Sequence, residues 1–181
     1  MQTRTKTISL VRCALAAALM AVCAWITVPG PVPFTLQTFA VFCALGLLGG
    51  FRGTASVLCY ILLGAVGLPV FSGFRGGVGA LLGSTGGYIL GFLTSALVYW
   101  AVVRSSRDLW RQALGMVLGL LTCYLFGTLW FVEVYTRASG AMTFGTALSL
   151  CVIPFLLPDA LKIALALLLT RTLGPRLERL A

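Results

Sequence analysis

The stretch "VIPFLLPDALKIALALLL", residues 152–169, decides how this chain is built. It is nearly as long as the roughly 20 apolar residues that cross a bilayer as a helix, yet it carries Asp159 and Lys162. A charged side chain at such depth costs about 2.5–3.5 kcal/mol on insertion scales. Because the two residues are three positions apart, they share one face of the helix. This face either packs on another helix as a self-satisfied ion pair or lines a ligand cavity, and we favour the cavity because an apolar pair would pack at lower cost.

Two prolines come just before the charged pair. Pro154 and Pro158 are expected to interrupt the helix, because proline lacks the N–H that a helix interior needs. Asp159 would then lie in the first turn of a half-helix, where the dipole and free N–H groups favour an anion. An ammonium beside it suits a carboxylate group of a ligand, and the aspartate suits N–H donors.

The composition of the whole chain is that of a membrane protein. Of its 181 residues, 60% are hydrophobic and 9% are charged, whereas a soluble domain carries about 25% charged residues. The apolar runs are unbroken, which favours helices over barrel strands that alternate with period two. We predict a single all-α integral membrane domain over residues 1–181, with its first apolar run kept as a helix. Its six transmembrane helices are expected at about 9–28, 36–50, 54–70, 84–103, 112–131 and 146–170.

The basic residues predict the orientation of these helices. Arg75 and Arg137 fall on one side of the predicted membrane, and Lys162 falls inside a span. The other ten basic residues share the opposite side: Arg4, Lys6, Arg12, Arg52, Arg104, Arg107, Arg111, Arg171, Arg176 and Arg179. That side should be cytoplasmic, so both termini are expected in the cytoplasm. The same clustering explains the net charge of +9 without nucleic acid as a partner.

Several classes of chemistry lack the residues they need. The chain has no histidine, and its six cysteines lie in apolar runs without a CxxC motif, so neither a zinc site nor a His-based triad is expected. Of four carboxylates, only Asp159 lies within a predicted span, which argues against an acid–base enzyme. The glycines near residue 80 are not followed by the GK[ST] of a nucleotide loop. We therefore expect no enzyme activity, metal or cofactor in this chain.

Two outer connections are expected to cover the cavity. Residues 27–35, "TVPGPVPFT", contain three prolines that stiffen the loop. Residues 71–91 are rich in glycine, and two pairs, Gly79 with Gly83 and Gly87 with Gly91, are spaced to allow close helix contact. Polar residues near these connections, which include Gln37, Ser84, Thr85 and Tyr88, are candidates for ligand contacts or for helix packing.

The first predicted helix carries small residues on neighbouring faces. Ala14 and Ala18 form one pair with four-residue spacing, and Ala17 and Ala21 form another. Such pairs allow close approach of a second helix. They either pack inside the bundle or offer a smooth face to a partner protein.

Four motifs, "PVPFTLQTF", "YILLGAVGLPVFSGFRGG", "GSTGGYILGF" and "PDALKI", follow in this order within residues 9–170. Together they resemble the BioY family, the biotin-specific substrate-binding (S) components of energy-coupling factor (ECF) vitamin transporters. The resemblance implies a six-helix protein of a bacterial cell membrane that binds biotin at its outer side. It also implies a transmembrane coupling subunit and two cytoplasmic ATPases as partners, which use ATP and dock on Ala14, Ala18 and Ala21. High-affinity biotin binding and uptake is the function we expect.

Biotin offers a carboxylate, a ureido group with two N–H donors and one carbonyl, and an apolar ring. The resemblance places ligand contacts at Asp159 and Lys162, with either residue at the ureido or the carboxylate end. An asparagine that some members carry in an outer loop is absent, so Ser84 or Thr85 is expected to replace it. The candidate ligand-binding residues are Asp159, Lys162, Gln37, Ser84, Thr85, Tyr88, Arg75, Phe34 and Phe74.

A stand-alone secondary carrier of a small carboxylic acid is the alternative function. In such a carrier, Asp159 or Lys162 would couple transport to protons. Many secondary carriers contain inverted repeats, and none is evident in this sequence.

Overall fold

The computed structural model describes residues 2–30 and 32–179. Pro31 of the predicted stiff loop lies outside the described residues, as do the side chains of Arg4 and Arg179. The elements in chain order are α1 (Gln2–Trp25), β1 (Thr27–Val28), β2 (Phe34–Thr35), α2 (Gln37–Leu48), α3 (Gly50–Ala65), the 3-10 turn η1 (Ser72–Phe74), α4 (Val78–Leu82), α5 (Gly86–Val103), α6 (Leu109–Ser139), α7 (Phe144–Cys151) and α8 (Ile153–Arg179).

The predicted helical class is confirmed. Four helices are long and apolar enough to cross a membrane, namely α1, α5, α6 and α8. α2 and α3 are apolar but contain only 12 and 16 residues, fewer than the roughly 20 that a typical crossing needs. Six complete crossings therefore stay a prediction.

The predicted last span consists of two helices rather than one. α7 ends at Cys151 and α8 begins at Ile153, so the break lies at Val152, before both prolines. Pro154 occupies the first turn of α8, where a missing N–H is tolerated, and Pro158 lies inside the helix. Our expectation that Asp159 starts a half-helix is wrong, because it is the seventh residue of α8 and lies in its second turn.

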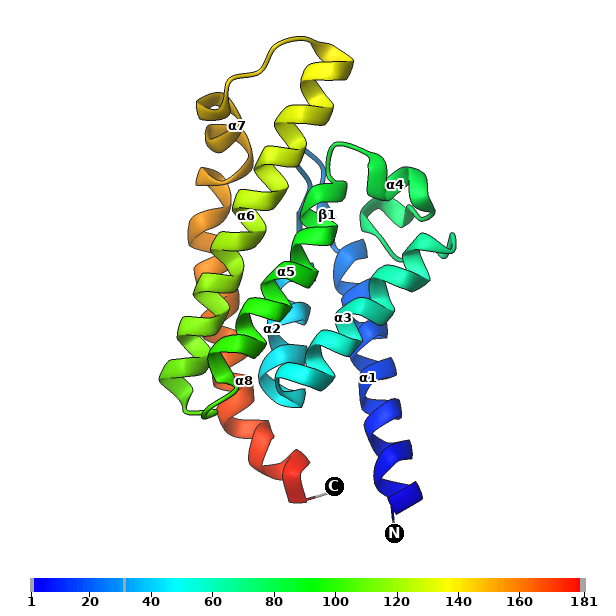
Figure 1. Cartoon of the computed structure of the whole chain (residues 1–181), viewed down its shortest axis with the longest axis vertical. Helices are drawn as coiled ribbons and strands as arrows, with labels where there is room; N and C mark the ends of the chain where they lie inside the picture. The colour runs from blue at the N-terminus through cyan, green and yellow to red at the C-terminus, as the bar shows by residue number, and fades with distance from the viewer. Residues whose placement is uncertain (1, 31, 180–181) are drawn as a thin grey trace.

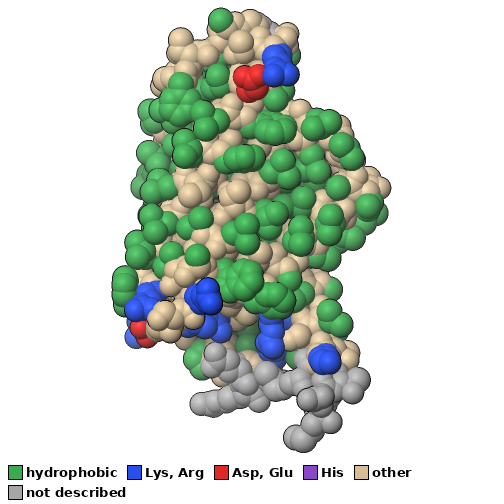
Figure 2. Space-filling view, viewed as in Figure 1, with side chains coloured by type: hydrophobic (Ala, Val, Ile, Leu, Met, Phe, Trp, Pro, Cys, Tyr) green, Lys and Arg blue, Asp and Glu red, His purple; other side chains and the backbone are tan. Residues whose placement is uncertain are grey.

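Both chain ends lie at the same end of the elongated molecule, and the connection between α6 and α7 lies at the other (Figure 1). Lys and Arg side chains gather near the termini on the visible face, whereas the opposite end shows one pair of opposite charges (Figure 2). This distribution agrees with the predicted orientation, in which the basic end faces the cytoplasm.

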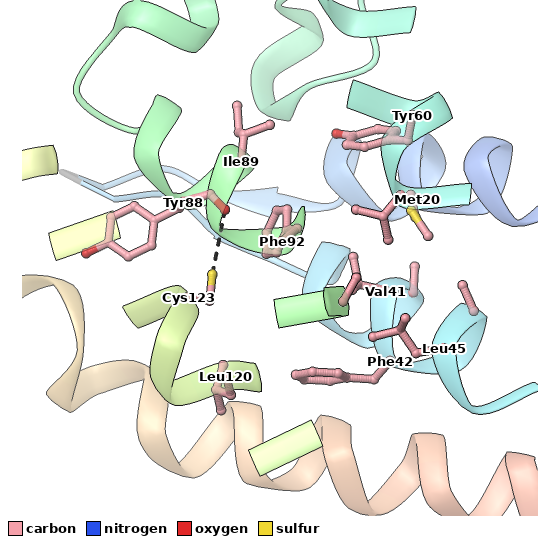
Figure 3. Packing of buried hydrophobic residues seen from close by; sticks show 14 of the residues in the cluster. Met20, Val41, Phe42, Leu45, Tyr60, Tyr88, Ile89, Phe92, Leu120 and Cys123 are labelled. Carbon is pink, nitrogen blue, oxygen red and sulfur yellow. Dashed lines mark hydrogen bonds between the residues drawn. The ribbon is translucent and has the colours of Figure 1, made fainter. Parts of the chain in front are cut away.

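Glycines let α5 and α6 pack closely along their length. A Cβ on Gly87 would lie 2.2 Å from the Trp130 side chain, and one on Gly127 would lie 2.2 Å from the Tyr88 ring. A Cβ on Gly91 would lie 2.9 Å from the Cys123 sulfur. The predicted role of Gly87 and Gly91 in close helix contact is thus confirmed, whereas that of Gly79 and Gly83 is wrong, because a Cβ on Gly79 would meet nothing within 4 Å and one on Gly83 only the preceding turn at 3.5 Å. In Figure 3, Tyr88 and Phe92 on α5 lie near Leu120 and Cys123 on α6.

Helix α2 is buried on almost every face, and it runs from Gln37 through Phe42 into the core. A helix that is apolar all round is typical of a position inside a bundle. Its first residues follow β2 directly, and β2 pairs antiparallel with β1 through Thr27 opposite Thr35. The hairpin therefore holds the start of α2 beside the middle of α8, which places the site described next.

Candidate ligand-binding site

Two adjoining cavities lie between the hairpin and helices α5, α6 and α8. The Asp159 cavity has an empty volume of about 440 Å³ and is lined by Val32, Pro33, Thr35, Thr38, Tyr88, Phe92, Leu120, Cys123, Tyr124, Cys151, Phe155, Asp159 and Lys162. The Arg75 cavity has about 460 Å³ and is lined by Val32, Pro33, Thr35, Gln37, Phe71, Ser72, Arg75, Ala80, Thr85, Tyr88, Ile89 and Phe92. Five of these residues border both, so the cavities are neighbours.

The predicted pair on α8 forms a buried ion pair. The Lys162 ammonium donates to Oδ1 of Asp159 at 2.7 Å. Asp159 is 2% exposed and Lys162 is 5% exposed. Charges removed from water need such partners, because an unpaired buried charge is strongly destabilising. The pair therefore satisfies itself and also lines the Asp159 cavity, which combines the two alternatives that the sequence left open.

Strand β2 of the hairpin and the first turn of α2 supply further partners for the pair. Lys162 donates to the Thr35 carbonyl oxygen at 2.7 Å and to Oγ1 of Thr38 at 2.9 Å. Thr38 in turn donates to Oδ1 of Asp159 at 3.0 Å. The ammonium also lies 4.3 Å from the centre of the Phe34 ring, a distance at which the face of the ring attracts a cation. This network ties the proline-containing hairpin to α8.

A tyrosine from α6 completes the carboxylate's surroundings. The Tyr124 hydroxyl donates to Oδ2 of Asp159 at 2.5 Å. Lys162 and Thr38 donate to the other oxygen, Oδ1. Both carboxylate oxygens therefore have a donor, and the three donors belong to three different helices. The position and orientation of Asp159 are thereby fixed before any ligand binds, which lowers the entropic cost of binding.

The Arg75 cavity has a different polar character. Arg75 follows η1, where its Nε donates to the Ser72 carbonyl at 3.2 Å, and it makes no ion pair within residues 2–30 and 32–179. Gln37 is buried and donates to the Tyr60 hydroxyl at 2.9 Å. Thr85 lies at the start of α5 and also lines this cavity. One guanidinium and several neutral groups thus face this space.

Residues from both predicted covering loops line the Arg75 cavity. Val32 and Pro33 come from the proline-containing loop, and Ser72 and Arg75 come from the glycine-rich one. The loops are also joined to each other, because Ser72 donates to Oγ1 of Thr27 at 3.0 Å. The interpretation of these loops as walls of a shared space agrees with this geometry.

Not every predicted ligand contact lines the cavities. Asp159, Lys162, Gln37, Thr85, Tyr88 and Arg75 all do. Phe34 is beside Lys162 but is outside the cavity linings. Ser84 is outside them too, and Phe74 is 64% exposed and stacks on Trp25, with 5.1 Å between ring centres. These two placements depend on the turn at η1 and the start of α5, which sequence alone does not define.

The alanines of α1 divide into two groups. Ala17 and Ala21 are 2% and 7% exposed and belong to the core, so they pack inside the bundle and are not free for a partner. Ala14 and Ala18 lie on the neighbouring face of the helix and are exposed. A docking face on α1 would therefore have to be built on these two.

Sequence reasoning missed several residues of the Asp159 cavity. Thr38, Tyr124, Cys123, Cys151 and Phe155 line it, although only Thr38 and Phe155 lie within a quoted stretch of sequence. Their signal was weak because single threonine, tyrosine, cysteine and phenylalanine residues are ordinary members of apolar helical runs. Within residues 2–30 and 32–179, no three His, Cys, Asp or Glu side chains meet as metal ligands.

Comparison with known proteins places this arrangement in a family. The family model described as "BioY family" matches residues 1–179. The chain is 40% identical to the biotin transporter BioY of Thermotoga maritima over 162 residues, 88% of this chain and 92% of that protein. It is also 40% identical to the probable biotin transporter BioY of Pyrococcus horikoshii over 171 residues, 94% of this chain and 97% of that protein.

A solved structure shares the fold as well. It is described as the S-component for biotin from an ECF-type ABC transporter, with a TM-score of 0.83 and 26% identity. The match covers 96% of this chain and 94% of the other. A family-model match over nearly the whole sequence, two relatives at 40% identity and a shared fold lead to one conclusion: this chain belongs to the BioY family.

Proposed function

We propose that this chain is the biotin-binding S component of an ECF-type transporter and that it binds biotin with high affinity in the two adjoining cavities. The observation that carries the proposal is the preorganised Asp159–Lys162 pair at the wall of a cavity, in a member of the BioY family. The names of its relatives as biotin transporters support the same substrate. Transport, rather than catalysis, is the role that fits this family.

The geometry favours one orientation of the ligand. Lys162 is already 2.7 Å from Oδ1 of Asp159, so a ligand carboxylate on Lys162 would bring a second anion next to the aspartate, and like charges repel strongly in a poorly solvated site. A ureido group is neutral and complementary, since its N–H groups donate to Asp159 and its carbonyl accepts from Lys162. We therefore place the ureido end in the Asp159 cavity.

The carboxylate then belongs in the other cavity. Arg75 is the cation there and makes no ion pair within the described ranges, and a guanidinium recognises carboxylates with two parallel hydrogen bonds. Between the two ends, Tyr88 and Phe92 border both cavities. Their apolar surfaces suit the sulfur-containing ring and the aliphatic chain of biotin.

Energy for uptake is assigned to partners. No nucleotide-binding motif is evident in this sequence, so a transmembrane coupling subunit and two cytoplasmic ATPases would supply it. The exposed small residues Ala14 and Ala18 on α1 are the proposed contact. The membrane is the cell membrane, with the basic end of the bundle in the cytoplasm.

Calorimetric titration of biotin and of biotinamide into the detergent-purified protein tests the site and the orientation together. We expect tight biotin binding by the wild type and its loss in Lys162→Met. Arg75→Gln should weaken biotin binding about tenfold or more but leave biotinamide binding nearly unchanged, because the amide has no charge to lose. Arg137→Gln removes an exposed arginine that lines neither cavity and serves as the charge-matched control.

Each contrary result has a definite meaning. If Arg75→Gln weakened both ligands equally, the proposed orientation would be wrong. If a folded wild type bound neither ligand, biotin would not be the substrate. Biotin uptake in cells without the ATPases, abolished when the proton gradient is collapsed, would instead establish a secondary carrier.

A further inference from the structure

A groove that is separate from the ligand cavities opens between α1 and α3, near the N-terminal end of α1. It is lined by Lys6, Ser9, Leu10, Cys13, Phe51, Arg52 and Ala55, and its empty volume is about 1,260 Å³. The α1 residues recur at three- and four-residue spacing, so they form one face of the helix. The groove is thus a continuous strip between two helices.

The groove combines two kinds of surface. Lys6 and Arg52 are both exposed and both basic. Leu10 and Phe51 are 71% and 67% exposed, so both offer apolar surface along the groove. The groove therefore has basic side chains in one part and exposed apolar side chains in another. This combination suits a molecule with an anionic head and an apolar tail.

The position of the groove matches the boundary of a membrane. Lys6 lies just before the apolar run of α1, which begins near residue 9, so it lies where that run meets the headgroup region. Lys and Arg gather at this end of the molecule (Figure 2). Basic pockets between transmembrane helices on the cytoplasmic side attract anionic lipid headgroups.

The walls of the groove are formed by the fold itself. The Cys13 thiol donates to the Arg52 carbonyl oxygen at 3.5 Å, which ties α1 to the first turns of α3. Gly53 faces inward, and a Cβ there would lie 2.8 Å from the Leu45 backbone. The two basic side chains are therefore presented by helices whose relative position is set by packing.

We propose that this groove binds one anionic phospholipid of the inner leaflet. Lys6 and Arg52 contact the phosphate-containing headgroup, and an acyl chain lies along Leu10, Phe51 and Ala55. The site is independent of the biotin cavities, since it shares no lining residue with them.

Native mass spectrometry of the detergent-solubilised full chain tests the proposal. The protein is titrated with phosphatidylglycerol and with phosphatidylcholine that carry the same acyl chains. We expect one saturable phosphatidylglycerol to bind more tightly than phosphatidylcholine, and the double variant Lys6→Gln/Arg52→Gln to lose most of that preference. Each basic residue near a membrane surface contributes roughly a fivefold change in affinity for an anionic headgroup.

The double variant Arg104→Gln/Arg111→Gln is the matched control. It removes the same charge, but neither residue lines the groove, so its phosphatidylglycerol affinity should stay within about twofold of the wild type. Equal losses in the two double variants, or no preference for phosphatidylglycerol in the wild type, would overturn the proposal. Equally tight binding of glycerol 3-phosphate would do so too, because it would show that the acyl chain contributes nothing to the site.

Discussion

Tyr124 on α6 donates a 2.5 Å hydrogen bond to Oδ2 of Asp159 on α8, 35 positions further along the chain. This contact brings a third helix to a carboxylate that Lys162 and Thr38 already hold from the other oxygen. The carboxylate is consequently oriented on both sides, and Asp159 also lines the cavity. The strength of ligand binding should depend on this support as much as on the ion pair.

Removing the Tyr124 hydroxyl should weaken biotin binding. Tyr124→Phe keeps the ring but leaves Oδ2 of Asp159 without its donor, and a hydrogen bond to a charged group contributes about 1.5–3 kcal/mol. We expect the Kd for biotin to rise by about tenfold in a calorimetric titration. Tyr135→Phe, on the same helix but outside both cavities, is the control. An unchanged Kd in Tyr124→Phe would show that the hydroxyl only packs the helices.

The ion pair has a structural part that is separable from its ligand-binding part. Asp159→Leu or Lys162→Met alone leaves one buried charge unpaired, which costs about 3–5 kcal/mol. Both single variants should therefore unfold at lower temperature in detergent than the wild type. The double variant Asp159→Leu/Lys162→Met should recover most of the stability without recovering biotin binding. Recovery of binding in the double variant would mean that the pair serves packing alone.

Close contact between α5 and α6 positions the Tyr88 ring at the border of the two cavities. A Cβ at Gly127 would lie 2.2 Å from that ring, so Gly127→Ala must displace it, and overpacking of this kind costs about 1–3 kcal/mol. We expect a lower unfolding temperature together with weaker biotin binding. At Gly145 a Cβ would meet nothing within 4 Å, and Gly145→Ala should leave both measurements unchanged. Wild-type behaviour of Gly127→Ala would contradict the packing described here.

The exposed small-residue face of α1 should matter for uptake but not for binding. Ala14→Trp adds a large ring on a face that is exposed in the isolated chain, so biotin binding should be retained. Docking of the coupling subunit should be blocked, and uptake of labelled biotin by cells that express the complete transporter should be lost. Ala101→Trp, at an exposed site on α5, controls for bulk in the membrane. Normal uptake by Ala14→Trp would exclude this docking face.

The two aromatic residues Phe74 and Phe92 should differ in importance. Phe92 borders both cavities, and truncation of such an anchor typically costs more than about 1 kcal/mol of binding. Phe74 stacks on Trp25 outside them and has a φ of 57°, which glycine adopts without strain. In titrations, Phe92→Ala should therefore bind biotin more weakly than Phe74→Gly. The opposite order would return Phe74 to the ligand site, as its sequence motif suggested.

The sequence by itself determined the features that follow from local chemistry. Unbroken apolar runs require helices, because backbone groups in lipid must be satisfied within the chain. The clustered basic residues predict which end faces the cytoplasm, and the cost of Asp159 and Lys162 in an apolar helix marked them as exceptional. Each of these conclusions needs only neighbouring residues and the properties of the bilayer.

Only the tertiary structure decided which side chains meet around that pair. Thr35 and Thr38 reach Lys162 across more than 120 positions, and Tyr124 reaches Asp159 from a separate helix. The tertiary structure also decided that Ala17 and Ala21 lie in the core and that Ala14 and Ala18 lie on the surface, although the two pairs have the same four-residue spacing. Helical periodicity tells which residues share a face, but the packing of the other helices decides whether that face meets lipid, protein or ligand.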